Sequence, residues 1–213
     1  MDLLIEESLS KYKTHIIDYA TLKSILTDLK YENINDKINK LKQKGILKSL
    51  KKGYFIHTSI NNKNIVSKEF ISNTLLDSPS YISLDYALFM YGLIPEAVHE
   101  ITAVTSKRSK VFKTELGIFS YKHIEKELFA LGLKMENSKE GNYLIATREK
   151  AICDKIFFTK DIEFSSKASM IDFLENDLRI DIDEFEDFNM KILSEYYQIS
   201  KSKKIKLLIN SLT

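Results

Sequence analysis

Features that mark many enzymes and secreted proteins are missing from this chain of 213 residues. Its single cysteine, Cys153, cannot form an internal disulfide, which fits a reducing compartment. The four histidines are scattered, and none pairs with another at the spacing of zinc ligands. The six glycines never cluster, which excludes a glycine-rich phosphate loop. No apolar run approaches the roughly 18 residues that a membrane-spanning helix needs.

These absences favour a protein that is not an enzyme, with no catalytic residues, cofactor or metal. Glu149 and Asp154 lie five residues apart and align poorly on one helical face, so surface or capping roles are preferred to acid–base catalysis. Cys153, next to Ile152 in a predicted helix, is expected to be a core thiol. The acidic, amphipathic amino terminus is unlike a secretory signal, so a cytoplasmic protein without a membrane partner is expected.

The net charge of +2 conceals strong segregation of charge along the chain. Residues 30–63 contain nine lysines against two acids, whereas residues 161–187 contain ten acids against two basic residues. Residues 191–213 are basic again, with five lysines against one acid. The acidic segment is either a solvated helical surface or a docking surface for a basic partner. The basic loop at residues 106–110 is either a solvated hairpin loop or a contact with nucleic acid or an acidic partner.

The first 62 residues have the pattern of a winged helix-turn-helix domain. Leu3, Leu4, Leu9 and Tyr12 are expected on one side of a first helix, and a short strand is expected at Ile16 and Ile17. A second helix is predicted at residues 21–29. A third helix begins after Asn33 as N-cap and ends at Gly45. Strands at residues 46–50 and 54–57 then form a hairpin with a turn at residues 51–53.

The rest of the chain predicts a mixed α/β domain followed by a helical tail, so the fold class is α+β. The domain boundary is placed in the polar segment at residues 61–64, which gives domains 1–62 and 63–213. The second domain is mixed α/β to about residue 160, and the tail covers residues 161–213. Its helices are expected at residues 66–76, after Ser83, and from Thr147 to Phe158; its strands are expected at residues 101–105, 111–113, 118–121 and 143–146.

The third helix and the hairpin carry the side chains expected to bind DNA. Asparagine and glutamine can form paired hydrogen bonds with adenine, and lysine reaches guanine or phosphate. The helix amino terminus can also donate backbone N–H groups to a phosphate. The alternative is a solvated basic face without a ligand. The candidate DNA-binding residues are Asn33, Asn35, Lys37, Asn39, Lys40, Gln43, Lys44 and Lys48, with Lys51 and Lys52 projecting from the hairpin tip.

Four blocks in the second region, taken in order, resemble the AbiEi family of bacterial antitoxins. They read PSYISLDYALFMYGLIPE (79–96), ITAVTSKR (101–108), TELGIFSY (114–121) and IATREKAICD (145–154). Upstream, LKQKGILKSLKKGYF (41–55) is similar to the winged helix-turn-helix of that family. The resemblance covers roughly residues 5–160. The chain departs from the family at Arg148, where a proline is frequent, and this changes only the start of a helix.

The resemblance implies the antitoxin of an abortive-infection toxin–antitoxin pair, a kind of phage-defence system. Its first domain would bind inverted repeats in duplex promoter DNA and repress its own operon, acting as a monomer or weak dimer. Its second domain would counter a cognate AbiEii-like nucleotidyltransferase toxin. The matched basic positions are Lys40, Lys44, Lys48, Lys51 and Lys52. Two alternatives remain open at this point: an antitoxin that acts mainly by direct toxin binding through its carboxy-terminal domain, and a stand-alone winged-helix regulator.

Overall fold

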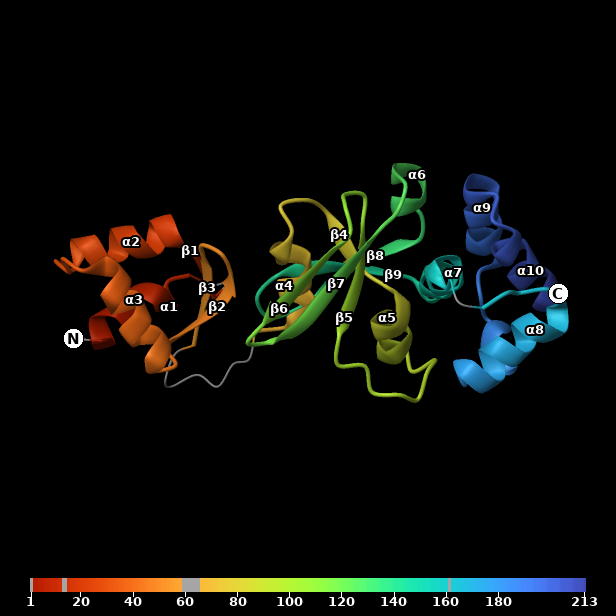
Figure 1. Ribbon diagram of the computed structural model, residues 1–213, viewed down its shortest axis with the longest axis horizontal. Coiled ribbons are helices and arrows are strands. Elements are labelled where there is room, and N and C mark those ends of the chain that lie inside the picture. Colours follow the sequence, from red (N-terminus) through yellow and green to blue (C-terminus); the bar gives the residue numbers. More distant parts are fainter. Residues whose placement is uncertain (1, 13–14, 59–65, 161) are drawn as a thin grey trace.

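The computed structural model describes residues 2–12, 15–58, 66–160 and 162–213. They form a mixed α+β structure with two separate sheets, as the sequence predicted (Figure 1). The expected domain boundary at residues 61–64 lies outside the described residues. The elements of the first region are α1 (Asp2–Ser10), β1 (Ile16–Asp18), α2 (Tyr19–Asp28), α3 (Ile34–Gln43), β2 (Leu47–Lys51) and β3 (Tyr54–His57).

Helices α1, α2 and α3 pack around a small core of leucine and isoleucine side chains. The expected apolar side of α1 was wrong, because Leu3 and Leu4 are 78% and 54% exposed. Leu9 is buried as expected, and Ile5 is buried with it in place of Leu3 and Leu4, since residues four apart lie on the same face of a helix. The three strands of the first region form an antiparallel sheet in the order β1-β3-β2.

Gly45 ends α3 as predicted. The Gly45 N–H donates to the Lys42 carbonyl, and the Ile46 N–H donates to the Leu41 carbonyl, which is the Schellman arrangement. Gly45 has a φ of +73°, a left-handed conformation that glycine adopts without a Cβ penalty. This turn sends the chain directly from α3 into β2, and so fixes the hairpin beside the carboxy-terminal end of the helix.

The second region contains a six-stranded mixed sheet in the order β6-β7-β5-β4-β9-β8. The predicted strands are confirmed, but β4 and β8 were not predicted. The strands are β4 (Ser80–Ile82), β5 (Ile101–Thr105), β6 (Lys110–Thr114), β7 (Gly117–His123), β8 (Leu133–Asn137) and β9 (Asn142–Ala146). The helices of this region up to residue 158 are α4 (Lys68–Leu75), α5 (Leu84–Met90), α6 (Lys126–Phe129) and α7 (Arg148–Phe158).

Helix α4 lies on one side of this sheet, and α5 and α7 lie on the other (Figure 1). Helix α7 begins as predicted, because the Thr147 side chain accepts a hydrogen bond from the Lys150 N–H. Arg148 is the first residue of the helix, the position where proline is also tolerated. Arginine at this position therefore leaves the helix start intact.

The carboxy-terminal segment is helical, as expected, and packs beyond α7 (Figure 1). Its acids are exposed in the described residues, while apolar residues such as Phe173 and Phe185 are buried. The acids of this segment therefore lie on the surface, an arrangement that both expectations for the segment share. Its elements are α8 (Lys167–Asp172), a π-helix (Phe173–Asp177), a 3-10 helix (Ile182–Phe185), α9 (Met190–Ser200) and α10 (Lys203–Ser211).

The two regions touch through the hairpin of the first. Leu50 and Ile56 belong to the large core cluster of the second region rather than to the small core around α1. Strand β2 also lies close to β6. Among the described helices, none is long and apolar enough to cross a bilayer.

Candidate nucleic-acid interface

Helix α3 presents a row of amide side chains on its outer face. Asn35, Asn39 and Gln43 follow one another at intervals of four residues and are all exposed. A spacing of eight residues spans about 12 Å along a helix, so the row covers most of the length of α3. Opposite the row, Ile38 and Leu41 are buried in the core. Because the apolar face of α3 packs on the core, the row of amide side chains points away from the protein.

The amide row keeps hydrogen-bonding capacity for a ligand. The Tyr19 hydroxyl donates to Asn35 Oδ1 at 2.9 Å, which leaves the Nδ2 donors of Asn35 unused by that bond. In the described part of the chain, the Asn39 and Gln43 side chains form no hydrogen bond. Both can therefore offer the donor and acceptor pair that recognises an adenine edge.

Two lysines expected to bind DNA are exposed near this row and one is half-buried. Lys40 lies beside the row on α3, and Lys52 lies at the hairpin tip; both are exposed. Lys48 is half-buried on β2, opposite Ile56 in the sheet register. Asp36, one turn before Lys40, is also exposed and places a negative charge on the same side. The charge of the face is therefore less positive than the lysine count alone indicates.

Two other candidate lysines of α3 are held by a carboxylate from the amino terminus. Lys37 Nζ lies 2.6 Å from Asp2 Oδ1, and Lys44 Nζ is hydrogen-bonded to Asp2 Oδ2. The hydrogen bonds from Lys37 and then Lys44 lower the pKa of Asp2 to about 2. Lys37 also lies 4.5 Å from the centroid of the Tyr31 ring, and its side chain is only 14% exposed. Lys44 keeps 59% exposure, so it remains accessible to a competing anion.

Lys51 does not project from the hairpin tip, and that expectation was wrong. Its Nζ donates to the Leu75 carbonyl at 3.0 Å and to Asp77 at 2.8 Å. The Leu75 carbonyl lies at the end of α4, where the helix dipole favours a cation. The Lys51 side chain is 13% exposed, and its amino group lies 4.4 Å from the centroid of the Tyr54 ring. Lys51 therefore joins the hairpin to the second region.

The chain matches no known family model and no curated protein sequence at a significant level. The identity of the site therefore depends on the geometry of its own residues.

Asn33 precedes α3 as predicted, but its side chain does not cap the helix. Its carbonyl instead accepts the first helical hydrogen bond, from the Lys37 N–H at 3.0 Å. Asn33 is exposed, so its amide lies at the open amino-terminal end of the helix. A phosphate bound there would accept hydrogen bonds from this amide as well as from backbone N–H groups.

The expectation of a surface role for Glu149 and Asp154 was wrong, because both residues are buried, whereas the expected capping role holds for Glu149. Glu149 accepts a hydrogen bond from the Asn189 N–H at 3.1 Å, next to the start of α9. Asp154 is fully buried and forms an ion pair with the buried Lys150 at 2.9 Å. Asp154 has no solvent exposure, and Glu149 has only a little.

Three hydroxyl groups complete the shell of Asp154. Ser83 Oγ and the Tyr81 hydroxyl donate to Oδ2 at 2.8 and 3.0 Å, and the Tyr196 hydroxyl donates to Oδ1 at 2.9 Å. Burial, followed by the nearby Asp154 charge, raises the pKa of both tyrosines. The cluster connects β4, α7 and α9, and its polar groups are satisfied, as a structural ion pair requires.

Cys153 is buried, as expected of a core thiol. Burial raises the pKa of its thiol, with the neighbouring Asp154 charge adding to the effect, so the thiolate is disfavoured. Across the described ranges, no group of three or more histidine, cysteine or acidic side chains is placed to share a metal ion.

Proposed function

We propose that residues 2–58 form a winged helix-turn-helix domain that binds duplex DNA. Helix α3 would be the recognition helix and the β2–β3 hairpin the wing. The observation that supports this most directly is the exposed row of Asn35, Asn39 and Gln43, opposite a buried apolar stripe. The width of α3 also fits this role, because the major groove of B-DNA is wide enough to admit an α-helix, whose outer side chains then contact the base edges.

The remaining candidate residues take different roles in this proposal. Lys40 and Lys52 are exposed and would contact phosphates, which position the protein without reading sequence. Lys44 would exchange Asp2 for a phosphate, since it is already half-exposed. Lys37 and Lys51 are largely buried in internal contacts, and they would support the orientation of α3 and of the hairpin.

At the level of the whole chain, we propose an antitoxin that represses its own operon and counters a nucleotidyltransferase toxin. The support is the ordered resemblance of four sequence blocks to the AbiEi family, together with the order of the two regions, in which the proposed DNA-binding domain precedes a larger α/β region. The alternative of direct toxin binding is favoured by one observation, the many exposed acids between residues 163 and 187, such as Glu184 and Asp187.

The DNA-binding proposal is tested with the full chain and duplexes from the promoter region upstream of its gene. Asn39→Ala should cost about 1–3 kcal/mol and relax the preference for one base pair, because it removes a base contact. Lys40→Ala should weaken binding to all duplexes and reduce the salt slope by about 0.9, the value for one phosphate contact. Fluorescence anisotropy over a salt series measures both effects.

Lys139→Ala is the matched control, since Lys139 is exposed on the turn between β8 and β9, far along the chain from α3. It should leave both the affinity and the salt slope unchanged. Unaltered binding by the Asn39 and Lys40 variants would show that α3 is not the recognition helix. The alternative is tested by co-purification of the chain with the product of the neighbouring gene: a salt-sensitive complex that is lost on charge reversal of the acidic segment supports direct toxin binding.

A further inference from the structure

One part of the large sheet is left uncovered by helices. In β6 and β7, Val111 and Ile118 are 57% and 40% exposed, although both are apolar residues of paired strands. Helix α5 packs against β5, and α7 packs against β9, so these helices cover the middle of the sheet. The β6–β7 edge therefore extends past them and forms one wall of an open groove.

The groove is continuous and runs from the β5–β6 loop to the carboxy-terminal helices. A hollow of about 670 Å³ lies between β7 and the end of α7, and it shares Lys122, Phe158 and Lys160 with a second hollow of about 410 Å³. Lys160 also lines a third hollow beside α10. At the other end, Ser109 and His123 connect the first hollow to the β5–β6 loop.

The lining of the groove is strongly basic. Lysine and arginine side chains outnumber carboxylates eight to three among the residues that line these hollows. One of the three carboxylates, Asp85, is neutralised by Lys155 at 2.6 Å. Within the described residues, neither Lys122 nor Lys160 forms an ion pair or a hydrogen bond. Two unpaired ammonium groups beside an open groove indicate an anionic ligand.

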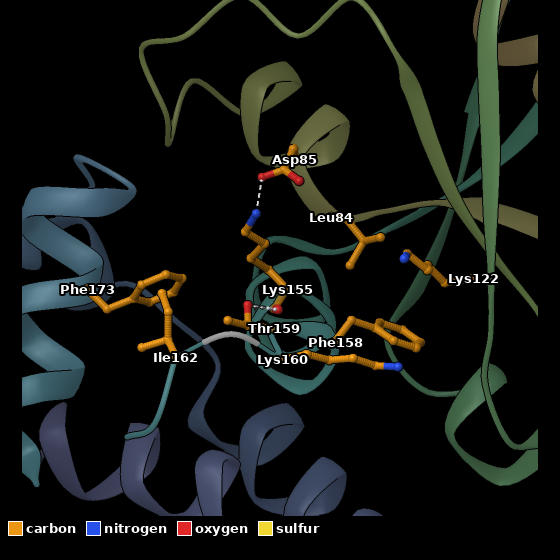
Figure 2. Close-up of a pocket in the computed structure, with 9 residues that line it drawn as sticks. All are labelled: Leu84, Asp85, Lys122, Lys155, Phe158, Thr159, Lys160, Ile162 and Phe173. Carbon is orange, nitrogen blue, oxygen red and sulfur yellow. Dashed lines mark hydrogen bonds and ion pairs between the residues drawn. The ribbon is translucent and has the colours of Figure 1, made fainter. Parts of the chain in front are cut away.

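An aromatic ring lies between these two cations. Figure 2 shows the side chains of Phe158 and Lys160 pointing the same way from the end of α7, towards the side where Lys122 lies. Phe158 is half-buried, and it is packed edge-on against Phe157 with ring centroids 5.3 Å apart. Phe157 in turn packs against Tyr196, so the side of the Phe158 ring that contacts Phe157 is held in place. A rigid ring flanked by free lysines suits a planar base that carries phosphates on both sides.

We propose that this groove binds a single-stranded segment of nucleic acid, with phosphates on Lys122 and Lys160 and an unpaired base against Phe158. An acidic peptide would use the lysines but would gain nothing specific from the ring. Duplex DNA would satisfy the lysines but keeps its bases stacked away from a side chain outside the helix. The site is separate from the α3 surface and does not depend on the function proposed for it.

The proposal is tested with the full chain and fluorescein-labelled single strands of about 12 nucleotides, as RNA and as DNA of the same mixed sequence. Lys122→Ala/Lys160→Ala should weaken binding and reduce the salt slope by about 1.4, which is two contacts at about 0.7 each for single strands. Phe158→Leu should weaken binding about five-fold or more, since a stacked base is lost while an apolar side chain is kept. Unlabelled mononucleotides as competitors separate a nucleotide pocket from a strand-binding groove: the proposal requires that they compete far less well than an unlabelled strand.

Lys139→Ala/Lys206→Ala is the matched control, because it removes the same charge from exposed positions that line none of these hollows. It should leave the salt slope unchanged. The proposal is overturned if neither strand binds at low salt, or if the two double variants weaken binding equally. It is also overturned if the strands do not bind and the Lys122→Ala/Lys160→Ala variant instead loses binding to a co-expressed protein partner. Loss of single-strand binding on Lys40→Ala, with the groove variants unaffected, would assign the strand to α3 instead.

Discussion

Replacement of Lys150 by methionine tests whether the buried cluster around Asp154 stabilises the second region. The change keeps the length of the side chain but removes its charge, which leaves the Asp154 carboxylate fully buried without a counter-ion. Breaking a buried ion pair from one side costs about 3–5 kcal/mol. The complementary change, Asp154→Asn, removes the counter-charge of the Lys150 ammonium group and leaves it only neutral acceptors such as the Leu128 carbonyl at 2.9 Å, so a similar loss is expected.

The double variant Lys150→Met/Asp154→Asn should be no less stable than either single variant, because it contains no unpaired charge. The two changes should therefore depart from additivity by about 2 kcal/mol or more. Urea unfolding followed by far-ultraviolet circular dichroism measures all three values, and against a total stability of about 5–15 kcal/mol the losses are large. Lys191→Met is the matched control, since Lys191 and Glu195 have the same four-residue spacing but are 79% and 45% exposed. It should cost less than about 0.5 kcal/mol.

Single variants that lose less than about 1 kcal/mol, or a double variant that loses the sum of both, would refute this account of the cluster. In that case the hydroxyl groups of Tyr81, Ser83 and Tyr196, rather than the Lys150 ammonium group, would be the main partners of Asp154.

Two further predictions concern Asp2. Asp2→Asn should raise duplex affinity about two- to five-fold at low salt, since an ion pair of this exposure contributes about 0.2–1 kcal/mol and Lys44 is then free for a phosphate. Fluorescence anisotropy with promoter DNA measures this change. Unchanged affinity would mean that Lys44 does not contact DNA. The second concerns pH: the pKa of Asp2 is lowered from 3.8 to about 2 on folding, so its stabilising contribution is complete above about pH 4 and is lost as pH falls towards 2. The difference in unfolding free energy between the protein and Asp2→Asn should therefore be present at pH 5 and shrink on acidification; a difference that does not change with pH would show that the ion pairs are not formed.

Much of the secondary structure could be predicted because local signals were strong. The α3 stripe with Gly45, the hairpin at Gly53 and the Thr147 cap each combine a periodic apolar pattern with a specific terminating residue. Strand β8 alternates apolar and polar residues over only Leu133 to Glu136 and is a mostly exposed edge, so its signal was too short to stand out. Strand β4 is only three residues long and is buried on both faces, which removes the alternation on which strand prediction depends.

The candidate interface was predictable in its residue types but not in its contacts. Lysine at position 37 or 51 looks the same in the sequence as lysine at position 40. Their partners are Asp2, 35 residues before Lys37, and Asp77, 26 residues after Lys51. Neither separation leaves a local pattern, and only the packed structure distinguishes a lysine open to a ligand from one that holds two elements together.

The anchoring of Lys51 on the end of α4 has a consequence for communication along the chain. If the hairpin binds DNA, its position depends on Asp77 and the Leu75 carbonyl, which belong to the other region. A molecule that pulls Asp77 away from Lys51 would then alter the affinity for DNA, and DNA would alter the affinity for that molecule by the same factor. Through the Lys51 ammonium group, a molecule bound to the second region would thus change how tightly the first region binds DNA.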